Sequence, residues 1–118
     1  MANKGYRDLI AWQKAMDFVV AVYQVSGDLP ADERYGLTSQ MRRAAVSVPS
    51  NICEGHGRTS PREFARFLEV ALGSLSETET QLQLAVRLKM LRADTVDPVL
   101  TQAAEIGRII NGLLKSLA

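Results

Sequence analysis

The sequence is poor in several features that would assign it to a special class of protein. It holds one cysteine, Cys53, so no disulfide can form within the chain, and we expect a reducing, cytoplasmic compartment. Aromatic residues make up 6% of the chain, and there are 8 glycines and 4 prolines. The longest uncharged apolar run, Phe18 to Tyr23, falls far short of the ~20 residues that span a bilayer. These low values exclude a disulfide scaffold and a collagen-like fibre, and they predict no contact with a membrane.

What remains is a balanced, globular composition. The 118 residues are 47% hydrophobic, which is enough for a core, and their number fits a single domain over residues 1–118. Basic side chains number 14 and acidic ones 13, for a formal charge of +1, so the chain does not coat nucleic acid through bulk charge alone. Ten of the basic side chains are arginine, which can form bidentate hydrogen bonds with carboxylate or phosphate.

Four segments carry the apolar spacing of amphipathic helices. We expect helices over about residues 8–25, 36–55 and 61–91, and a fourth that starts near 95–97. The connections between them are short, and no β-hairpin signal or internal repeat is visible. This pattern predicts an all-α fold, an antiparallel up-down-up-down four-helix bundle.

Local signals mark the boundaries of the expected helices. Ser60 is a suitable N-cap for the third helix, Pro61 suits its first position, and Glu63 completes a capping box. Pro49 lies inside the second segment and either kinks that helix or ends it near Val48. Because the apolar face continues in phase beyond the proline, we favour the kink.

The first expected helix has two apolar stripes, although one stripe per helix is enough in a small monomer. The stripes are Leu9, Trp12, Met16, Val19 and Tyr23, and, beside them, Ala11, Ala15, Phe18, Val22 and Val25. The third helix also looks apolar on more than one side. Extra apolar faces predict burial against a second copy of the chain, and the alternative is that these helices are well covered within one chain.

Antiparallel packing gathers the charges at the two ends of the bundle. The start of the first helix, the turn between the second and third helices and the end of the fourth helix share one end. The basic side chains at that end are Lys4, Arg7, Arg58, Arg62, Arg66 and Lys115. Against three acidic side chains they give a net charge of +3, whereas four basic and five acidic side chains give the opposite end −1. A basic end attracts phosphate backbones without reading sequence, and the alternative is an ordinary solvated helix end.

Two polar residues on different helices form a candidate pair. We expect Arg43, on the second helix, and Glu77, on the third, to pair across a helix–helix or subunit contact. Such a pair would fix the register of that contact more than it would add to net stability. A paired-carboxylate site made by Glu54 and Glu77 is the weaker interpretation, because no histidine or further acid sits at a supporting spacing.

No pattern in the chain indicates catalysis, a metal or a cofactor. Cys53 and His56 form a lone Cys-x-x-His, which predicts a buried thiol and a turn histidine in place of a metal site or a catalytic pair. The turn from Gly55 to Gly57 lacks the spacing and the lysine of a phosphate-binding loop. We therefore expect no catalytic residues, no metal and no cofactor, and we interpret the protein as non-enzymatic.

Three ordered motifs resemble one bacterial protein family. The first motif is Tyr6-Arg7-Asp8-Leu9 with Trp12. The second is Gln40, Arg42-Arg43-Ala44, Ser47, Asn51-Ile52 and Glu54-Gly55, and the third is Phe64, Phe67-Leu68, Ala71, Gly73-Ser74 and Glu77. Together they are similar, over nearly the whole chain, to the four-helix-bundle proteins named for the intervening sequences of 23S ribosomal RNA genes. The accessory variability proteins of diversity-generating retroelements are relatives of that family.

The resemblance implies a left-handed bundle, assembly as a ring-like homopentamer and a non-enzymatic role. The retroelement relatives bind nucleic acid through a basic surface and also bind a reverse transcriptase. By this resemblance, RNA or DNA would be contacted by Lys4, Arg7, Arg58, Arg62 and Arg66. Cys53 stands where the family pattern has alanine, and the charge of +1 is lower than that of the retroelement relatives.

Two functional hypotheses follow. In the first, a pentameric helix bundle binds RNA or DNA non-specifically through the five basic residues just named. In the second, the ring is a protein-interaction scaffold that docks a partner such as a reverse transcriptase and touches no nucleic acid. Salt-dependent binding to RNA separates the two.

Overall fold

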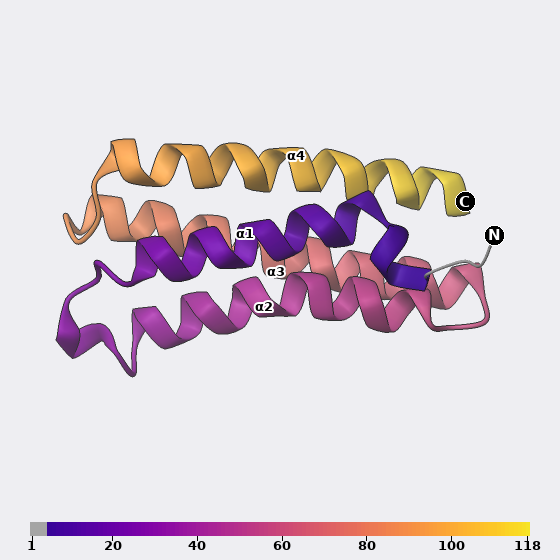
Figure 1. The fold of residues 1–118 in the computed structure, drawn as a ribbon, viewed down its shortest axis with the longest axis horizontal. Coiled ribbons are helices and arrows are strands. Elements are labelled where there is room, and N and C mark those ends of the chain that lie inside the picture. Colours follow the sequence, from indigo (N-terminus) through magenta and orange to yellow (C-terminus); the bar gives the residue numbers. More distant parts are fainter. Residues whose placement is uncertain (1–4) are drawn as a thin grey trace.

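The computed structural model describes residues 5–118, which form four long helices and two short 3-10 turns. The elements are η1 (Gly5–Asp8), α1 (Ile10–Ser26), η2 (Ala31–Glu33), α2 (Leu37–His56), α3 (Pro61–Arg87) and α4 (Ala93–Leu117). No strand occurs between residues 5 and 118, and successive long helices run in opposite directions (Figure 1). The predicted all-α, up-down-up-down bundle is confirmed.

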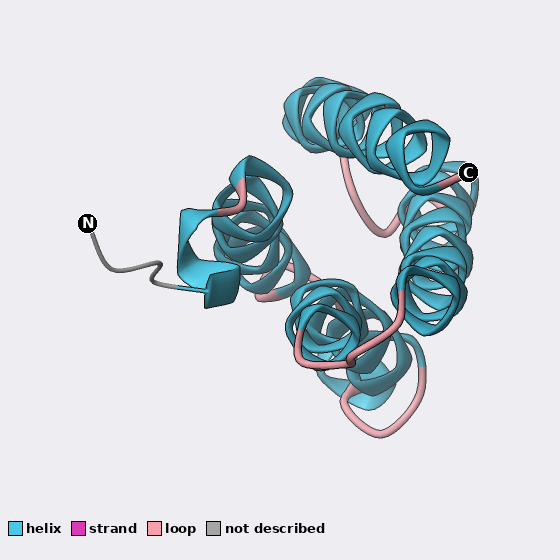
Figure 2. Ribbon diagram, turned by 90° about the vertical axis from the view of Figure 1, so that its right-hand side faces the viewer, coloured by secondary structure: helices cyan, strands magenta, loops and turns pink. Residues whose placement is uncertain are grey.

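The four long helices surround one core. Each packs against the next in the chain, and α4 returns to pack against α1, as the view along the bundle shows (Figure 2). The longest dimension of the molecule is 46 Å. A straight helix of the length of α3, 27 residues, accounts for about 40 Å of this. The length of the bundle is therefore set by its longest helices, and the functional surfaces lie along its sides and at its two ends.

Two helix boundaries differ from the expected ones for local reasons. The first helix starts at Ile10 because residues 5–8 form the separate turn η1. The third ends at Arg87, four residues early, because Lys89 adopts a left-handed backbone with φ of 61°. The N–H groups of Met90 and Lys89 then donate to the carbonyl oxygens of Ala85 (2.9 Å) and Val86 (3.0 Å). These two bonds form a Schellman motif, which closes α3 and turns the chain toward α4.

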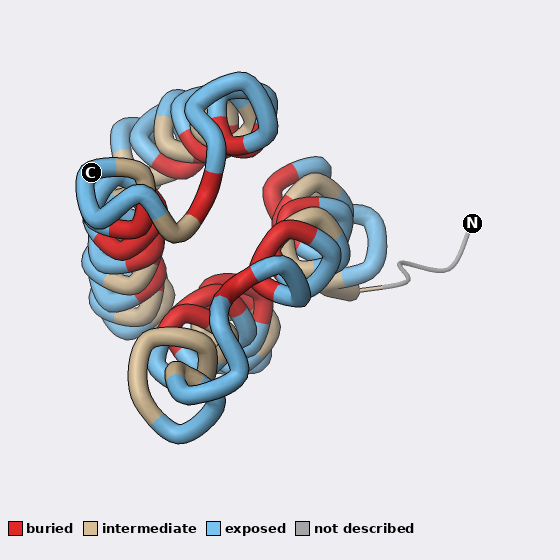
Figure 3. The backbone as a smooth tube through the Cα atoms, turned by 90° about the vertical axis from the view of Figure 1, so that its left-hand side faces the viewer, coloured by how far each residue is buried: buried red, intermediate tan, exposed pale blue. Residues whose placement is uncertain are grey.

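The core uses one of the two apolar stripes of α1. Ala11, Ala15, Phe18, Val22 and Val25 are buried, and buried segments of all four helices face inward (Figure 3). The other stripe is only partly covered: Trp12 and Val19 are half-buried against the core, whereas Met16 is 42% exposed and Tyr23 is 43% exposed. Leu84 on α3 and Leu88 at its C-cap are also exposed. The extra apolar faces seen in the sequence are thus not fully covered within the described chain.

The second helix passes through Pro49 without ending. It runs from Leu37 to His56, and Pro49 is itself buried in its packed face. The alternative in which the helix stops near Val48 is therefore wrong. None of the helices among the described residues is long and apolar enough to cross a membrane.

Candidate nucleic-acid interface

The turn between α2 and α3 is fixed by a helix cap. Ser60 is the N-cap of α3, and its hydroxyl oxygen accepts a hydrogen bond of 3.0 Å from the backbone N–H of Glu63. Pro61 occupies the first position of the helix, where no intrahelical donor is needed. The cap predicted from the sequence is confirmed, and it sets the direction in which the first turns of α3 leave the bundle end.

Close packing of α2 on α3 holds this turn in place. Gly55, in the last turn of α2, is buried, and a Cβ at this position would lie 2.6 Å from the Cβ of Phe67 and 3.0 Å from Cδ1 of Phe64. Only glycine allows the two helices to approach this closely. The ring of His56 meets the ring of Phe64 edge-on, with 5.6 Å between centroids. The basic end is therefore built on a tightly packed helix pair.

Arg58 contacts this helix pair through Phe67. Its guanidinium carbon is 4.9 Å from the centre of the Phe67 ring. Its Nη2 also lies 3.4 Å from Oε1 of Glu54, one helical turn earlier. Glu54 thus neutralises part of the charge of Arg58, and this exposed ion pair adds little to stability.

Arg62 and Arg66 carry the free charge of the basic end. They stand four residues apart on α3, so their side chains lie on the same side of the helix. Both are exposed, and neither forms an ion pair with any residue between 5 and 118. Two unpaired guanidinium groups one helical turn apart can each bind a phosphate oxygen pair.

The other basic residues predicted at this end are Arg7, Lys115 and Lys4. Arg7 is exposed in η1, and its guanidinium carbon lies 5.2 Å from the centre of the Tyr6 ring. Lys115 is exposed in the last turn of α4. The first turn of α1, the α2–α3 turn and the C-terminus lie at the same end of the bundle (Figure 1). Lys4 lies outside the described residues.

Arg43 and Glu77 face a common hollow without touching. The hollow lies between α2 and α3, has a volume of about 340 Å³, and includes both side chains in its lining. Of the ion pairs found in residues 5–118, none joins Arg43 to Glu77. Instead, Oε2 of Glu77 accepts a hydrogen bond of 3.2 Å from Nε2 of Gln81. Pairing across a contact between two copies stays a prediction.

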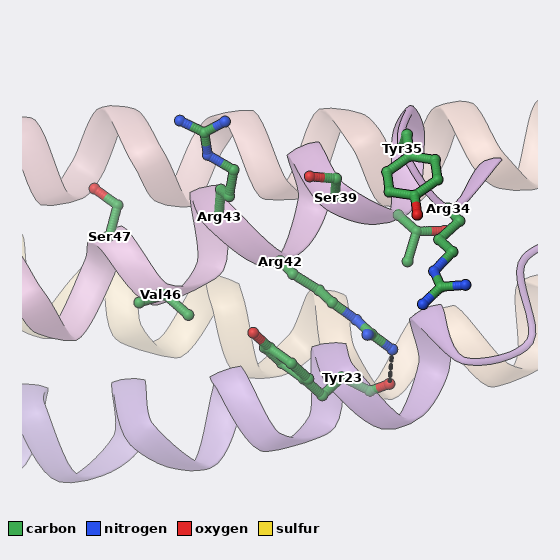
Figure 4. A pocket seen from close by; sticks show the side chains of 9 residues that line it. Tyr23, Arg34, Tyr35, Ser39, Arg42, Arg43, Val46 and Ser47 are labelled. Atoms are coloured by element: carbon green, nitrogen blue, oxygen red, sulfur yellow. Dashed lines mark hydrogen bonds between the residues drawn. The ribbon is translucent and has the colours of Figure 1, made fainter.

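A second basic site, which the sequence reasoning missed, lies on the outer side of α1 and α2. It is a hollow of about 650 Å³, here called the arginine hollow. It is lined by Tyr23, Arg34, Tyr35, Thr38, Ser39, Arg42, Arg43, Val46 and Ser47. Figure 4 shows Arg34 and Arg42 on the side of α2 that faces α1, whereas Arg43 extends toward α3. None of these nine lining residues carries a carboxylate.

Arg42 is the anchored member of the arginine hollow. Its Nε donates to the hydroxyl oxygen of Ser26 over 2.8 Å, and its Nη2 donates to the carbonyl oxygen of Tyr23 over 3.2 Å. Its guanidinium carbon also lies 4.5 Å from the centre of the Tyr23 ring. All three partners are neutral, so the charge of Arg42 is fixed in position without being compensated.

A sum of charge over each end of the bundle does not reveal the arginine hollow. Arg34 is one of the four basic side chains at the end whose net charge is −1, where five acidic side chains outnumber them. In the structure one of those acids, Glu33, accepts a hydrogen bond of 3.0 Å from the backbone N–H of Leu37 and does not line the hollow. Another, Asp94, pairs with Arg92 across 2.7 Å. A hydrogen bond from Arg92 holds the pKa of Asp94 below its usual range.

Cys53 and His56 do not form a site together. Cys53 is half-buried in a groove of about 330 Å³ between α1 and α2, whose lining includes Tyr6, Trp12 and Met16. The thiol predicted to be buried is therefore only partly covered. His56 packs on Phe64, and no hydrogen bond links it to Cys53. Within residues 5–118, no three His, Cys, Asp or Glu side chains gather as a metal site would require.

These features define an antiparallel four-helix bundle with two separate arginine-rich surfaces. Residues 7–112 match the family described as 23S rRNA-intervening sequence protein, and the chain belongs to this family. No curated protein matches the chain. The resemblance carried by the three motifs is therefore confirmed for the family.

The fold is shared with a solved structure from Bacteroides thetaiotaomicron. That protein, of unknown function and from the S23 ribosomal protein family, is 22% identical to this chain, with a TM-score of 0.82. The match covers 90% of this chain and 96% of the other. At this identity the likeness supports the fold alone.

Proposed function

We propose that this protein is a non-enzymatic, self-assembling helix bundle that binds RNA or DNA through its basic end without reading sequence. The observation that carries the proposal is the pair Arg62 and Arg66, exposed one turn apart on α3 without a carboxylate partner among the described residues. Arg58 and Arg7 flank them at the same end, and Lys4 precedes Arg7 in the chain. Phosphate contacts from such side chains give affinity that depends on salt and not on base sequence.

Self-assembly is supported by the apolar side chains left at the surface. On α1 these are Ile10, Met16 and Val20, and on α3 and its C-cap they are Val70, Leu84 and Leu88. Because these two sets lie on different helices, contact of one set with the other set of a neighbouring copy would be head-to-tail, and such a contact forms a ring when the rotation from copy to copy closes. The family resemblance gives five as the number of copies, and Arg43 would meet Glu77 across the contact. A ring with parallel bundle axes would gather five basic ends on one face and make the electrostatic potential of that face more positive.

A glutamate placed in the exposed stripe tests the assembly. Met16→Glu should convert the assembly into smaller species, because a charge would be buried at the contact between copies. The fold of each copy should survive, since Met16 is 42% exposed in the single chain. Sedimentation velocity measures the assembly and circular dichroism the helices.

The matched control for this substitution is Ala104→Glu, which adds the same side chain at an exposed position of α4, away from the exposed apolar side chains of α1 and α3. It should leave the sedimentation coefficient of the wild type unchanged. If Met16→Glu also sediments like the wild type, the α1 stripe is not the contact between copies.

The non-enzymatic role is supported by where the reactive side chains lie. The imidazole of His56 is packed edge-on against Phe64, and the thiol of Cys53 lies in a mainly apolar groove. A nucleophile needs a base within hydrogen-bond reach and a third group to orient that base. Neither side chain has such a neighbour among the hydrogen bonds of residues 5–118.

A protein-interaction scaffold is the second candidate function, and the apolar groove between α1 and α2 favours it. Tyr6 and Trp12 meet there edge-on with 5.2 Å between ring centroids. Aromatic side chains in a shallow apolar groove are common anchors in protein interfaces.

Binding to RNA decides between these two candidates. The assembled protein should bind unrelated RNA and DNA oligomers with similar affinity at low salt, and the affinity should fall steeply as salt is added. Fluorescence anisotropy with two RNA sequences and one DNA sequence measures this. Absence of binding at low salt, by a protein shown to be assembled, would eliminate the nucleic-acid function and leave the scaffold.

A further inference from the structure

The arginine hollow has the donors of an anion site at the end of the bundle opposite the basic end. Its charged lining residues are all arginines, and the lining adds the hydroxyl groups of Thr38 and Ser39. Arg42 is held by Ser26 and Tyr23 through two of its five N–H groups, so three N–H groups stay available. A guanidinium group fixed by neutral partners has already lost its side-chain entropy before a ligand arrives.

Arg34 brings a second guanidinium group to the same side of α2. It lies with Arg42 between α2 and α1 in Figure 4. Its guanidinium carbon is 5.5 Å from the centre of the Tyr35 ring, and it takes part in none of the ion pairs formed by residues 5–118. The adjacent carboxylate of Glu33 is bonded to the backbone N–H of Leu37, at the start of α2. No lining carboxylate therefore competes with an incoming anion for these two arginines.

We propose that the arginine hollow binds a phosphate group, held mainly by Arg34 and Arg42. Two guanidinium forks and two hydroxyl groups offer more donors than the two oxygens of a carboxylate can use, whereas a phosphate presents three or four oxygens. The guanidinium group of Arg42 covers one face of the Tyr23 ring, and that of Arg34 lies over the Tyr35 ring. Tyr35 is 87% exposed, so the other face of its ring is open to a stacked base. The ligand class is thus a nucleoside phosphate, either free or at the end of a nucleic-acid strand.

Calorimetric titration of the assembled protein with small probes tests the site. Uridine 5′-monophosphate should bind at least tenfold more tightly than uridine, because only the former brings a phosphate. Arg34→Ala should weaken binding of the monophosphate about tenfold, the loss expected for one charged hydrogen-bonded contact. Arg42→Lys keeps the charge, loses the fork that reaches both Ser26 and Tyr23, and should also weaken binding.

The matched control is Arg87→Ala, which removes one exposed arginine at the same end of the bundle but outside the hollow. It should leave the affinity for the monophosphate unchanged. An equal loss in Arg87→Ala and Arg34→Ala would show a general charge effect and overturn the proposal. Equal affinities for uridine and its monophosphate, or no binding of the monophosphate at millimolar concentration, would overturn it as well.

RNA oligomers with and without a 5′-phosphate distinguish the two sources of the ligand. They are titrated into the variant in which Arg58, Arg62 and Arg66 are all alanine, so that the basic end contributes little. A gain from the 5′-phosphate that disappears with Arg34→Ala identifies a strand end as the ligand. Tight binding of the monophosphate without such a gain identifies a free nucleotide, and both outcomes support the site.

Discussion

At the α2–α3 turn Arg62 and Arg66 stand free in solvent, whereas in the arginine hollow Arg42 is bonded to a carbonyl and a hydroxyl group of α1. The two surfaces carry the same kind of charge on the same bundle. They differ in how much freedom the charged group keeps. Free side chains can follow a phosphate backbone in many registers, while an anchored guanidinium group selects an anion of one shape. The count of arginines is therefore less informative than the partners of each one.

The two surfaces also differ in what builds them. The basic end depends on close contact between apolar groups and on a glycine, since Gly55 lies against Phe67 and Phe64. The arginine hollow depends on polar contacts between α1 and α2, made by the same side chain that would bind the anion. At the basic end, one set of substitutions should therefore change the helix packing and another set the charge. At the arginine hollow, a substitution of Arg42 should change both together.

The largest expected effect on stability is at the basic end. Gly55→Ala would place a Cβ 2.6 Å from the Cβ of Phe67, which forces α2 and α3 apart. The overpacking costs about 3 kcal/mol, and the better helix propensity of alanine returns about 1, for a net loss of about 2 kcal/mol. Chemical denaturation measures the loss.

Gly112→Ala is the control for this substitution, because a Cβ at Gly112 has nothing within 4 Å. It lies inside α4 and should gain about 0.5–1 kcal/mol in the free energy of unfolding. A Gly55→Ala protein as stable as the wild type would show that the α2–α3 turn does not depend on close approach.

A smaller loss is expected at the arginine hollow. Arg42→Ala removes the hydrogen bonds to Ser26 and Tyr23 and the contact with the Tyr23 ring, and it should cost about 1 kcal/mol. Arg108→Ala is the control, since Arg108 is exposed on α4 and forms no ion pair within residues 5–118. Urea denaturation of both variants checks this, and equal stabilities would mean that Arg42 is not anchored.

The smallest effect is expected for an exposed ion pair, which sharpens the contrast with anchored Arg42. The hydrogen bond from Arg92 lowers the pKa of Asp94 below 3.8, so the carboxylate stabilises the fold at higher pH. This contribution is present above pH 3.8 and disappears as the pH falls through the lowered value.

Asp94→Asn should therefore be slightly less stable than the wild type near pH 7 and equal to it in strong acid. Thermal melts across this pH range measure the difference, with Asp97→Asn as the neighbouring control. A difference that grows as the pH falls would have the wrong sign for this account.

Periodicity predicts the helices of this chain well because each has at least one strong apolar stripe. It does not say which of the two stripes of α1 is the core. The stripe with Phe18 and four small side chains is buried, while the one with Trp12 and Met16 is only partly covered. Small residues let α1 approach its neighbours closely, which is a property of packing that spacing alone does not express. The sequence predicts the end of α3 four residues too late, because a lysine, and not a glycine, adopts the left-handed backbone that ends the helix.

Of the two candidate sites, the sequence predicts the basic end and does not predict the arginine hollow. The basic end follows from antiparallel connectivity, which places the α2–α3 turn beside the chain ends whatever the details of packing. The arginine hollow depends on which side of α2 faces α1 and on the partners of Glu33 and Arg42, and these are set by tertiary contacts. The spacing of Ser39, Arg42 and Val46 along one side of α2 was the available signal.

The salt dependence of RNA binding is the most direct test of a sequence-independent basic end. The logarithm of the affinity is plotted against the logarithm of the salt concentration for the wild type and for the variant with alanine at Arg58, Arg62 and Arg66. The account predicts weaker binding by the variant and a slope that is shallower by about 2, because three phosphate contacts to a single strand are lost. Identical affinities and slopes for two equally assembled proteins would contradict it.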